Sequence, residues 1–275
     1  MSNYRISDPV ILDIDLELFE YKQGQPILTN IKQKIHNIQR DDVLQGQVVA
    51  VLGPSGIGKS TLFELVAGLI NPTKGSIKAY DKTKNDLVPV DAGMVGMVYQ
   101  SYDVYPFLSV KGQLELGAKK GNFSGKEADD KINYYLDYFR LKEHANKYPN
   151  QLSGGQKQRL AIAQQLLCSN IILLMDEPFS GLDPVIKKDM CELIAEIAQL
   201  DELQTIIIVS HDIEPTLSIA DTVWLVGKTP QGGSTIVETI NMMDKGLCWQ
   251  KNIQDSSEFQ HLCNYVTKKF MALNG

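Results

Sequence analysis

The chain has 275 residues, 43% of them hydrophobic, which is enough for one large domain or for a domain with a small appendage. A net charge of -6 disfavours a general nucleic-acid binder, because such proteins usually carry a basic face. No apolar stretch approaches the roughly 18 residues of a membrane-spanning helix, the N-terminus lacks the apolar core of a signal peptide, and the four cysteines have no metal-ligand spacing. We therefore expect a cytosolic protein with reduced thiols, whose membrane role, if any, comes through a partner.

The first predicted elements are antiparallel strands in residues 8–35, where apolar residues such as Ile14 and Leu16 alternate with polar ones. The alternation over residues 12–21 predicts an edge strand. Residues 36–45 then predict a loop insertion before the next strand.

A phosphate-binding loop is the clearest local motif. Residues 47–52 have the composition of a buried parallel strand and lead into the pattern G-x-x-x-x-G-K-[ST], which a predicted helix over residues 61–70 follows. The loop consists of Gly53, Pro54, Ser55, Gly56, Ile57, Gly58, Lys59, Ser60 and Thr61. Its backbone N–H groups and the helix N-terminus would face the phosphates. Lys59 would supply a charge for the β- and γ-phosphates, and the Ser60 hydroxyl would ligate Mg²⁺.

Two carboxylates follow a second apolar strand at residues 171–175. In an open α/β sheet, the carboxyl ends of the strands form the edge where ligands bind. Asp176 would hold Mg²⁺ there, directly or through water, and Glu177 would polarise the water that attacks the γ-phosphate.

A third motif narrows the class of nucleotide-binding protein that the phosphate loop and the carboxylate pair indicate. Residues 152–156 read Leu-Ser-Gly-Gly-Gln and precede a predicted helix, and with the motifs above they make the sequence resemble the ABC ATPase family. Three shorter segments resemble the rest of the family pattern: the strand end at Gln100, the run from Ser180 to Asp183, and the strand that ends at His211.

The resemblance implies a shared site. Two chains, identical or homologous, would sandwich ATP head to tail, so that Ser153, Gly154, Gly155 and Gln156 contact the nucleotide held by the facing subunit. The catalytic residues would be Glu177, His211, Lys59 and Gln100, with Gln100 also a ligand of Mg²⁺. Asp183 would lie at the subunit interface, and Tyr21, with Phe19 as second candidate, would stack on the adenine.

The resemblance also implies an α/β fold over residues 8–240. It has a P-loop NTPase core whose mainly parallel sheet comes from residues 46–100 and 165–230, an N-terminal antiparallel β subdomain, and an inserted helical subdomain at about residues 101–164. Within the insert we expect a helix around residues 127–140. Residues 241–275 would form a C-terminal extension that ends in a packed amphipathic helix from about Glu258 to Leu273.

The type of ABC protein follows from the single nucleotide domain. A solitary ABC domain resembles the ATPase subunit of a bacterial importer, and residues 234–240 resemble the nitrate/sulfonate/taurine branch. Such a subunit would bind an integral membrane permease at the cytoplasmic face of the plasma membrane and serve a substrate-binding protein indirectly. An ABC ATPase that drives lipid or lipoprotein extraction is the alternative, and a nucleotide-sensing scaffold without turnover is a third. The cargo is not encoded in these residues.

Overall fold

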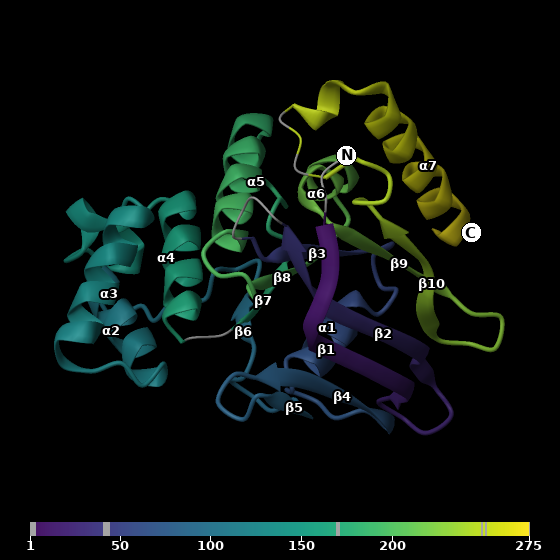
Figure 1. Ribbon diagram of the computed structural model, residues 1–275, viewed down its shortest axis with the longest axis horizontal. Helices are drawn as coiled ribbons and strands as arrows, with labels where there is room; N and C mark the ends of the chain where they lie inside the picture. Colours follow the sequence, from purple (N-terminus) through teal and green to yellow (C-terminus); the bar gives the residue numbers. More distant parts are fainter. Residues whose placement is uncertain (1–3, 41–44, 169–170, 249, 251, 275) are drawn as a thin grey trace. The chain divides into compact units, whose positions relative to one another are not determined.

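The computed structural model describes residues 4–40, 45–168, 171–248, 250 and 252–274 (Figure 1). These residues form two compact units, the first made of Met1–Val95 with Leu174–Gly275 and the second of Gly96–Leu173. Among the described residues, no helix combines the length and the apolar character needed to cross a membrane.

The first unit is built on a mixed sheet. In spatial order its strands are β5 (Asp86–Pro89), β4 (Lys74–Asp81), β1 (Tyr4–Glu20), β2 (Pro26–Arg40), β10 (Ser234–Asn241), β9 (Thr222–Lys228), β3 (Gln47–Leu52), β8 (Thr205–Ser210) and β7 (Ile172–Asp176). Strand β3 runs parallel to β8 and β9, whereas β1 is antiparallel to β2 and β4. The predicted α/β fold class is confirmed.

The helices of the first unit are α1 (Lys59–Val66), α5 (Pro184–Ala198), α6 (Ile213–Ile219) and α7 (Ser257–Asn274). The second unit contains β6 (Gly96–Val98), α2 (Val110–Lys120), α3 (Gly125–Tyr138) and α4 (Gly154–Leu167). In the second unit α2 approaches α4 closely, since a Cβ at Gly117 would lie 2.7 Å from the carbonyl oxygen of Gln164. The end of α3 is packed through Phe139, which is fully buried, while Tyr134 stays exposed.

Two expectations for the N-terminal strands are wrong. Strand β1 is not an edge strand, because β4 pairs with it on the side away from β2. Residues 36–40 are not a loop, because they extend β2 and pair with the start of β1, with Tyr4 opposite Arg40. Both partners are supplied by segments distant in the chain, and no local pattern reports them. In the rest of the predicted insertion, residues 41–44 lie outside the described residues, and Gln45 is part of no helix or strand.

Two further expectations, for the helix after the phosphate loop and for the strands that follow it, are wrong. Helix α1 ends at Val66 rather than at residue 70, because Gly68 adopts φ +70° and packs against the backbone of Asp91. Within residues 46–100, expected to supply parallel strands, β4 and β5 instead form an antiparallel pair. The antiparallel part of the sheet is therefore larger than predicted.

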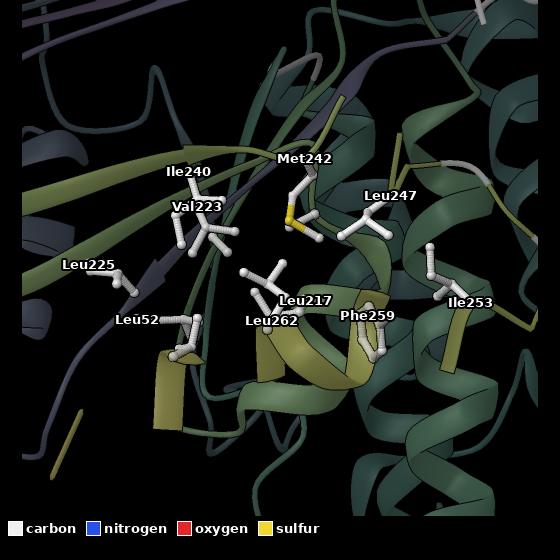
Figure 2. Close-up of a cluster of buried hydrophobic side chains, with 13 residues drawn as sticks. Leu52, Leu217, Val223, Leu225, Ile240, Met242, Leu247, Ile253, Phe259 and Leu262 are labelled. Atoms are coloured by element: carbon white, nitrogen blue, oxygen red, sulfur yellow. The ribbon is translucent and has the colours of Figure 1, made fainter. Parts of the chain in front are cut away.

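A hydrophobic cluster joins the C-terminal helix to the sheet (Figure 2). Helix α7 contributes Phe259, Leu262 and Val266, which pack with side chains from β3, β9, β10 and α6. Near the end of α7, Leu273 lies close to Gly227 of β9. A Cβ added at Gly227 would be 2.5 Å from the Cδ2 atom of Leu273. The span of α7 is close to that of the amphipathic helix expected from the sequence. The extended end of β1 also meets the C-terminal region, since the Tyr4 hydroxyl donates to Asp244.

Candidate active site

The phosphate loop has the backbone shape that its glycines allow. Gly56 and Gly58 adopt φ +75° and +101°, conformations that L side chains rarely reach. Gly53 is confined in another way, because a Cβ there would lie 3.0 Å from the Val226 carbonyl oxygen. Within the loop Ser55 and Ser60 are exposed and Ile57 is buried.

Lys59 is folded into this loop. Its Nζ donates to the carbonyl oxygens of Gly53 at 2.7 Å and Pro54 at 3.0 Å, and only 7% of the residue is exposed. Burial lowers the pKa of Lys59, and the negative charges of Glu177 and Asp176 oppose that shift. The ammonium is therefore held where a phosphate could replace the two carbonyl oxygens.

The two carboxylates at the end of β7 have different environments. Burial raises the pKa of Asp176, and Glu177 raises it further, while Lys59 lowers it. Glu177 adopts φ 50°, and its backbone N–H donates to the Val209 carbonyl oxygen at 2.8 Å. This turn directs the Glu177 side chain towards the end of the neighbouring strand β8.

Glu177 and His211 form the central contact of the site. The His211 Nδ1 lies 2.8 Å from Glu177 Oε2, and the same oxygen accepts from the His211 backbone N–H and the Ser210 hydroxyl, each at 3.3 Å. Three donors thus converge on one carboxylate oxygen. His211 was predicted from its place in the sequence, but Ser210 was missed, because a serine at a strand end carries no signal of its own.

Asp183 begins helix α5. Its side chain accepts from the backbone N–H groups of Val185 at 3.0 Å and Ile186 at 3.1 Å, as an N-terminal capping residue does. Val185 is 70% exposed. The predicted interface role of Asp183 stays a prediction, since a cap alone also explains this residue.

The two candidate adenine partners differ in exposure. Phe19 is 5% exposed and belongs to the core, while Tyr21 is 62% exposed and packs edge-on against Phe19 at 4.8 Å. The Tyr21 hydroxyl donates to Glu64 at 3.3 Å. A ring that stacks on a ligand must present a face to solvent, so the geometry favours Tyr21.

The run at 152–156 lies in the second unit and begins α4. Ser153 caps this helix: its Oγ accepts from the Gln156 backbone N–H at 3.3 Å, and the Gln156 side-chain oxygen accepts from the Ser153 backbone N–H at 2.9 Å. This reciprocal pair is a capping box. Gly154 and Gly155 are exposed. Gln100, which follows β6, also lies in the second unit.

The residues of the first unit fit a nucleotide and a hard divalent cation. The positive-φ glycines and the buried lysine provide a cradle for phosphates, which a Cβ would disturb. Mg²⁺ is bound in such sites by one or two carboxylates together with hydroxyl and phosphate oxygens. Asp176 and Ser60 are donors of this kind.

Comparison with known proteins agrees with this geometry. The family model described as ABC transporter matches residues 38–180. The nitrate import ATP-binding protein NrtD of Synechocystis sp. is 40% identical over 215 residues, which cover 78% of this chain and 76% of that protein. The Fe(3+) ions import ATP-binding protein FbpC of Fusobacterium nucleatum is 37% identical over 76% of this chain, and the match spans about half, 54%, of that protein.

A solved structure gives the same assignment. The structure of cbiO1 from Clostridium perfringens, described as part of the ABC transporter complex cbiONQ, aligns with a TM-score of 0.71 and 28% sequence identity. The alignment covers 87% of this chain and 91% of cbiO1. From the matched family, the relatives and the site geometry, this chain belongs to the ABC transporter family, in which it is an ATP-binding domain that hydrolyses ATP.

Proposed function

We propose that this chain is the ATPase subunit of an ABC importer, and that two such subunits, identical or homologous, enclose ATP between them. Each subunit would bind ATP through its phosphate loop and offer its residues 153–156 to the nucleotide of the other. The names of the relatives support import, since the nitrate and Fe(3+) proteins are both import ATP-binding proteins.

The chemistry is phosphoryl transfer to water, in which positioning and charge do most of the work. Lys59 would exchange its two carbonyl partners for phosphate oxygens. Glu177 would accept a proton from the attacking water, and His211, held at 2.8 Å from Glu177, would orient that carboxylate. Asp176, Ser60 and Gln100 would hold Mg²⁺, which neutralises charge on the phosphates when bound.

One observation carries the proposed sharing of ATP. At Gly154 and Gly155 an added Cβ would meet no described atom within 4 Å, and neither glycine has a positive φ. The fold of this chain therefore does not require glycine at these two positions. The close approach of a ligand from outside would require it.

Mixing two inactive variants tests this geometry. Lys59→Ala removes the phosphate-loop charge, and Gly154→Asp places a negative charge where a phosphate would approach, while suiting a helix N-terminus. In a mixed dimer, the intact loop of one chain meets the intact glycine run of the other. We expect an equimolar mixture to regain up to about a quarter of the wild-type ATPase rate, because half of the dimers are mixed and each has one complete site.

The matched control is a mixture of two preparations of Lys59→Ala. It offers no complete site and should stay inactive. Absence of recovery in the mixture of the two different variants, at every mixing ratio, would show that each chain completes its own site.

An exposed aromatic pair supports permease docking. Phe107 is 71% exposed and Tyr105 42%, with ring centroids 5.8 Å apart. Buried Gln113 holds their loop, because its side-chain amide donates to the Tyr105 carbonyl oxygen and accepts from the Tyr105 N–H, each at 3.0 Å. A rigid apolar surface of this kind suits a permease segment and would place the subunit at the cytoplasmic face of the membrane.

Phe107→Ser tests this surface in the assembled transporter. We expect co-purification with the permease to weaken about tenfold or more, because exposed aromatic anchors often dominate interfaces. The ATP affinity of the isolated subunit should stay unchanged. Met271→Ser, which alters a side chain that is 70% exposed on α7, is the control. Equal permease binding by the wild type and Phe107→Ser would remove the pair from the interface.

The similarity to a nitrate import ATP-binding protein supports the nitrate/sulfonate/taurine branch. Identification of the permease and the binding protein that co-purify with this subunit tests it. A lipid- or lipoprotein-extracting membrane partner would favour the alternative function.

A further inference from the structure

We propose that His144 is a positioning residue, which fixes the side chain of Gln156 and, through it, the Ser153 hydroxyl. The inference rests on the proposed function, because Ser153 and Gln156 matter for ATP only if they face a second subunit. His144 lies outside every motif that the sequence singled out, twelve residues before Gln156 in the chain.

The contact is short and specific. The side-chain nitrogen Nε2 of Gln156 lies 2.8 Å from Nε2 of His144. Gln156 Oε1 is already engaged, since it accepts from the Ser153 backbone N–H at 2.9 Å. The amide of Gln156 is thus used at both ends, with its oxygen towards Ser153 and its nitrogen towards His144.

Only one protonation state of His144 satisfies both contacts. The nitrogen of a glutamine amide only donates, so His144 Nε2 must accept through its lone pair and the proton of the neutral ring must lie on Nδ1. A flipped Gln156 amide would instead point its nitrogen at the Ser153 N–H, placing two donors together. The capping box and the tautomer of His144 therefore determine each other.

The backbone of His144 is fixed in place. It ends a 3₁₀ turn, Lys142–His144, in which its N–H donates to Leu141 at 2.9 Å and its carbonyl oxygen accepts from Lys147 at 2.8 Å. The next segment is tied to the start of α2, where the Lys111 N–H donates to the Ala145 carbonyl oxygen at 2.9 Å. An acceptor anchored in this way can hold Gln156 in one rotamer.

The arrangement has an energetic cost that a purely structural residue could avoid. His144 Nδ1 is buried and has no hydrogen-bond partner among the described residues. In the required tautomer this nitrogen carries a proton, so a buried donor is left unsatisfied. An apolar side chain of similar size would remove that cost, and it would also remove the acceptor for Gln156.

Fixing Gln156 determines what Ser153 can offer a ligand. The Ser153 Oγ accepts from the Gln156 N–H at 3.3 Å, which occupies one lone pair and leaves the hydroxyl proton available. That proton could then be donated to a phosphate oxygen. Without the His144 acceptor, the Gln156 amide is free to rotate and both halves of the capping box weaken.

The tautomer can be read directly. The chain has only four histidines, so ¹⁵N-histidine labelling gives a simple spectrum, in which the signal lost in His144→Leu identifies His144. At about pH 8, where imidazoles are mainly neutral, we expect a protonated Nδ1 and an unprotonated Nε2. In Gln156→Ala this preference should disappear. A protonated Nε2 in the wild type would overturn the inference.

The functional test uses a Glu177→Gln background, in which ATP should remain uncleaved and hold the dimer together. In His144→Leu we expect the ATP affinity of the monomer to be unchanged. The dissociation constant of the ATP-dependent dimer should rise about 25-fold, because each of the two sites loses one hydrogen bond and each loss costs about fivefold. Sedimentation with ATP and Mg²⁺ measures the dimer. His144→Gln, whose side-chain oxygen can replace Nε2 as acceptor, should restore it.

His261→Leu, the same substitution at an exposed position of α7, is the control and should dimerise as the parent does. If the Glu177→Gln parent dimerises with ATP and the His144→Leu variant dimerises equally well, the inference about His144 is wrong while the proposed function stands. A parent that never dimerises with ATP would remove the proposed function and the inference with it. Should His144→Leu fail to fold, the histidine spectrum of the wild type and of Gln156→Ala still decides.

Discussion

Glu177→Gln is expected to lower the ATP turnover rate by about 10³-fold and to leave ATP binding nearly unchanged. Glutamine has the shape of glutamate, and one amide oxygen can still accept from Ser210 and from the His211 backbone N–H, which now meet Glu177 Oε2. What the amide cannot do is take a proton from water at neutral pH. The change therefore removes the base and keeps the architecture.

Steady-state ATPase rates and calorimetric titration with ATP measure the two halves of this expectation. Glu202→Gln, which neutralises an exposed glutamate in a turn, is the matched control and should keep the wild-type rate. If Glu177→Gln retained a rate within about threefold of the wild type, another group would have to act as the base, since general-base catalysis typically contributes 10²–10⁴-fold.

Lys59→Met is expected to weaken ATP binding by about 100-fold, because a charge-assisted contact to phosphate is lost. The nucleotide-free chain should keep its Tm or gain slightly. Burial lowers the pKa of Lys59 in the folded state, so at every pH below that folded-state value its charge opposes folding. This unfavourable contribution to folding disappears as the pH rises to the pKa that the lysine has in the unfolded chain. At neutral pH the Lys59→Met substitution removes it.

Thermal unfolding with and without ATP measures both effects. The wild type should show an ATP-dependent rise in Tm, and Lys59→Met should show almost none. Lys188→Met, an exposed position on α5, should behave as the wild type. A fall of several degrees in the Tm of nucleotide-free Lys59→Met would mean that the lysine stabilises the loop through its bonds to Gly53 and Pro54, and that burial is the smaller effect.

The parts of the site that could be predicted are those whose residues are adjacent in the chain. The phosphate loop, the Asp176-Glu177 pair and the Ser153–Gln156 run each combine a short pattern with a strand or helix next to it. Turn geometry and strand-end position are local properties, so a sequence pattern can report them. His211 was predicted from the resemblance to the family pattern, in which a histidine ends an apolar strand after the other motifs.

The contacts between these pieces were not predictable, because they join distant segments. Glu177 meets Ser210 and His211 across more than thirty residues, and His144 meets Gln156 from a turn with no motif. The edge assignment of β1 failed for the same reason, since its second neighbour β4 enters the sheet only after the phosphate loop. The choice between Phe19 and Tyr21 likewise depended on burial by neighbouring elements.

The sequence by itself indicated the ABC family, through its resemblance to the family motifs, and the α/β fold class, and it supplied the candidate phosphate-binding and catalytic residues as short motifs beside predicted strands and helices. Only the tertiary structure decided which oxygen of Glu177 is held, that Tyr21 and not Phe19 is exposed, that residues 36–40 extend a strand, and that His144 supports Gln156. Such contacts depend on how separate strands and turns pack, and hydrogen-bond partners distant in the chain leave no periodic trace in it.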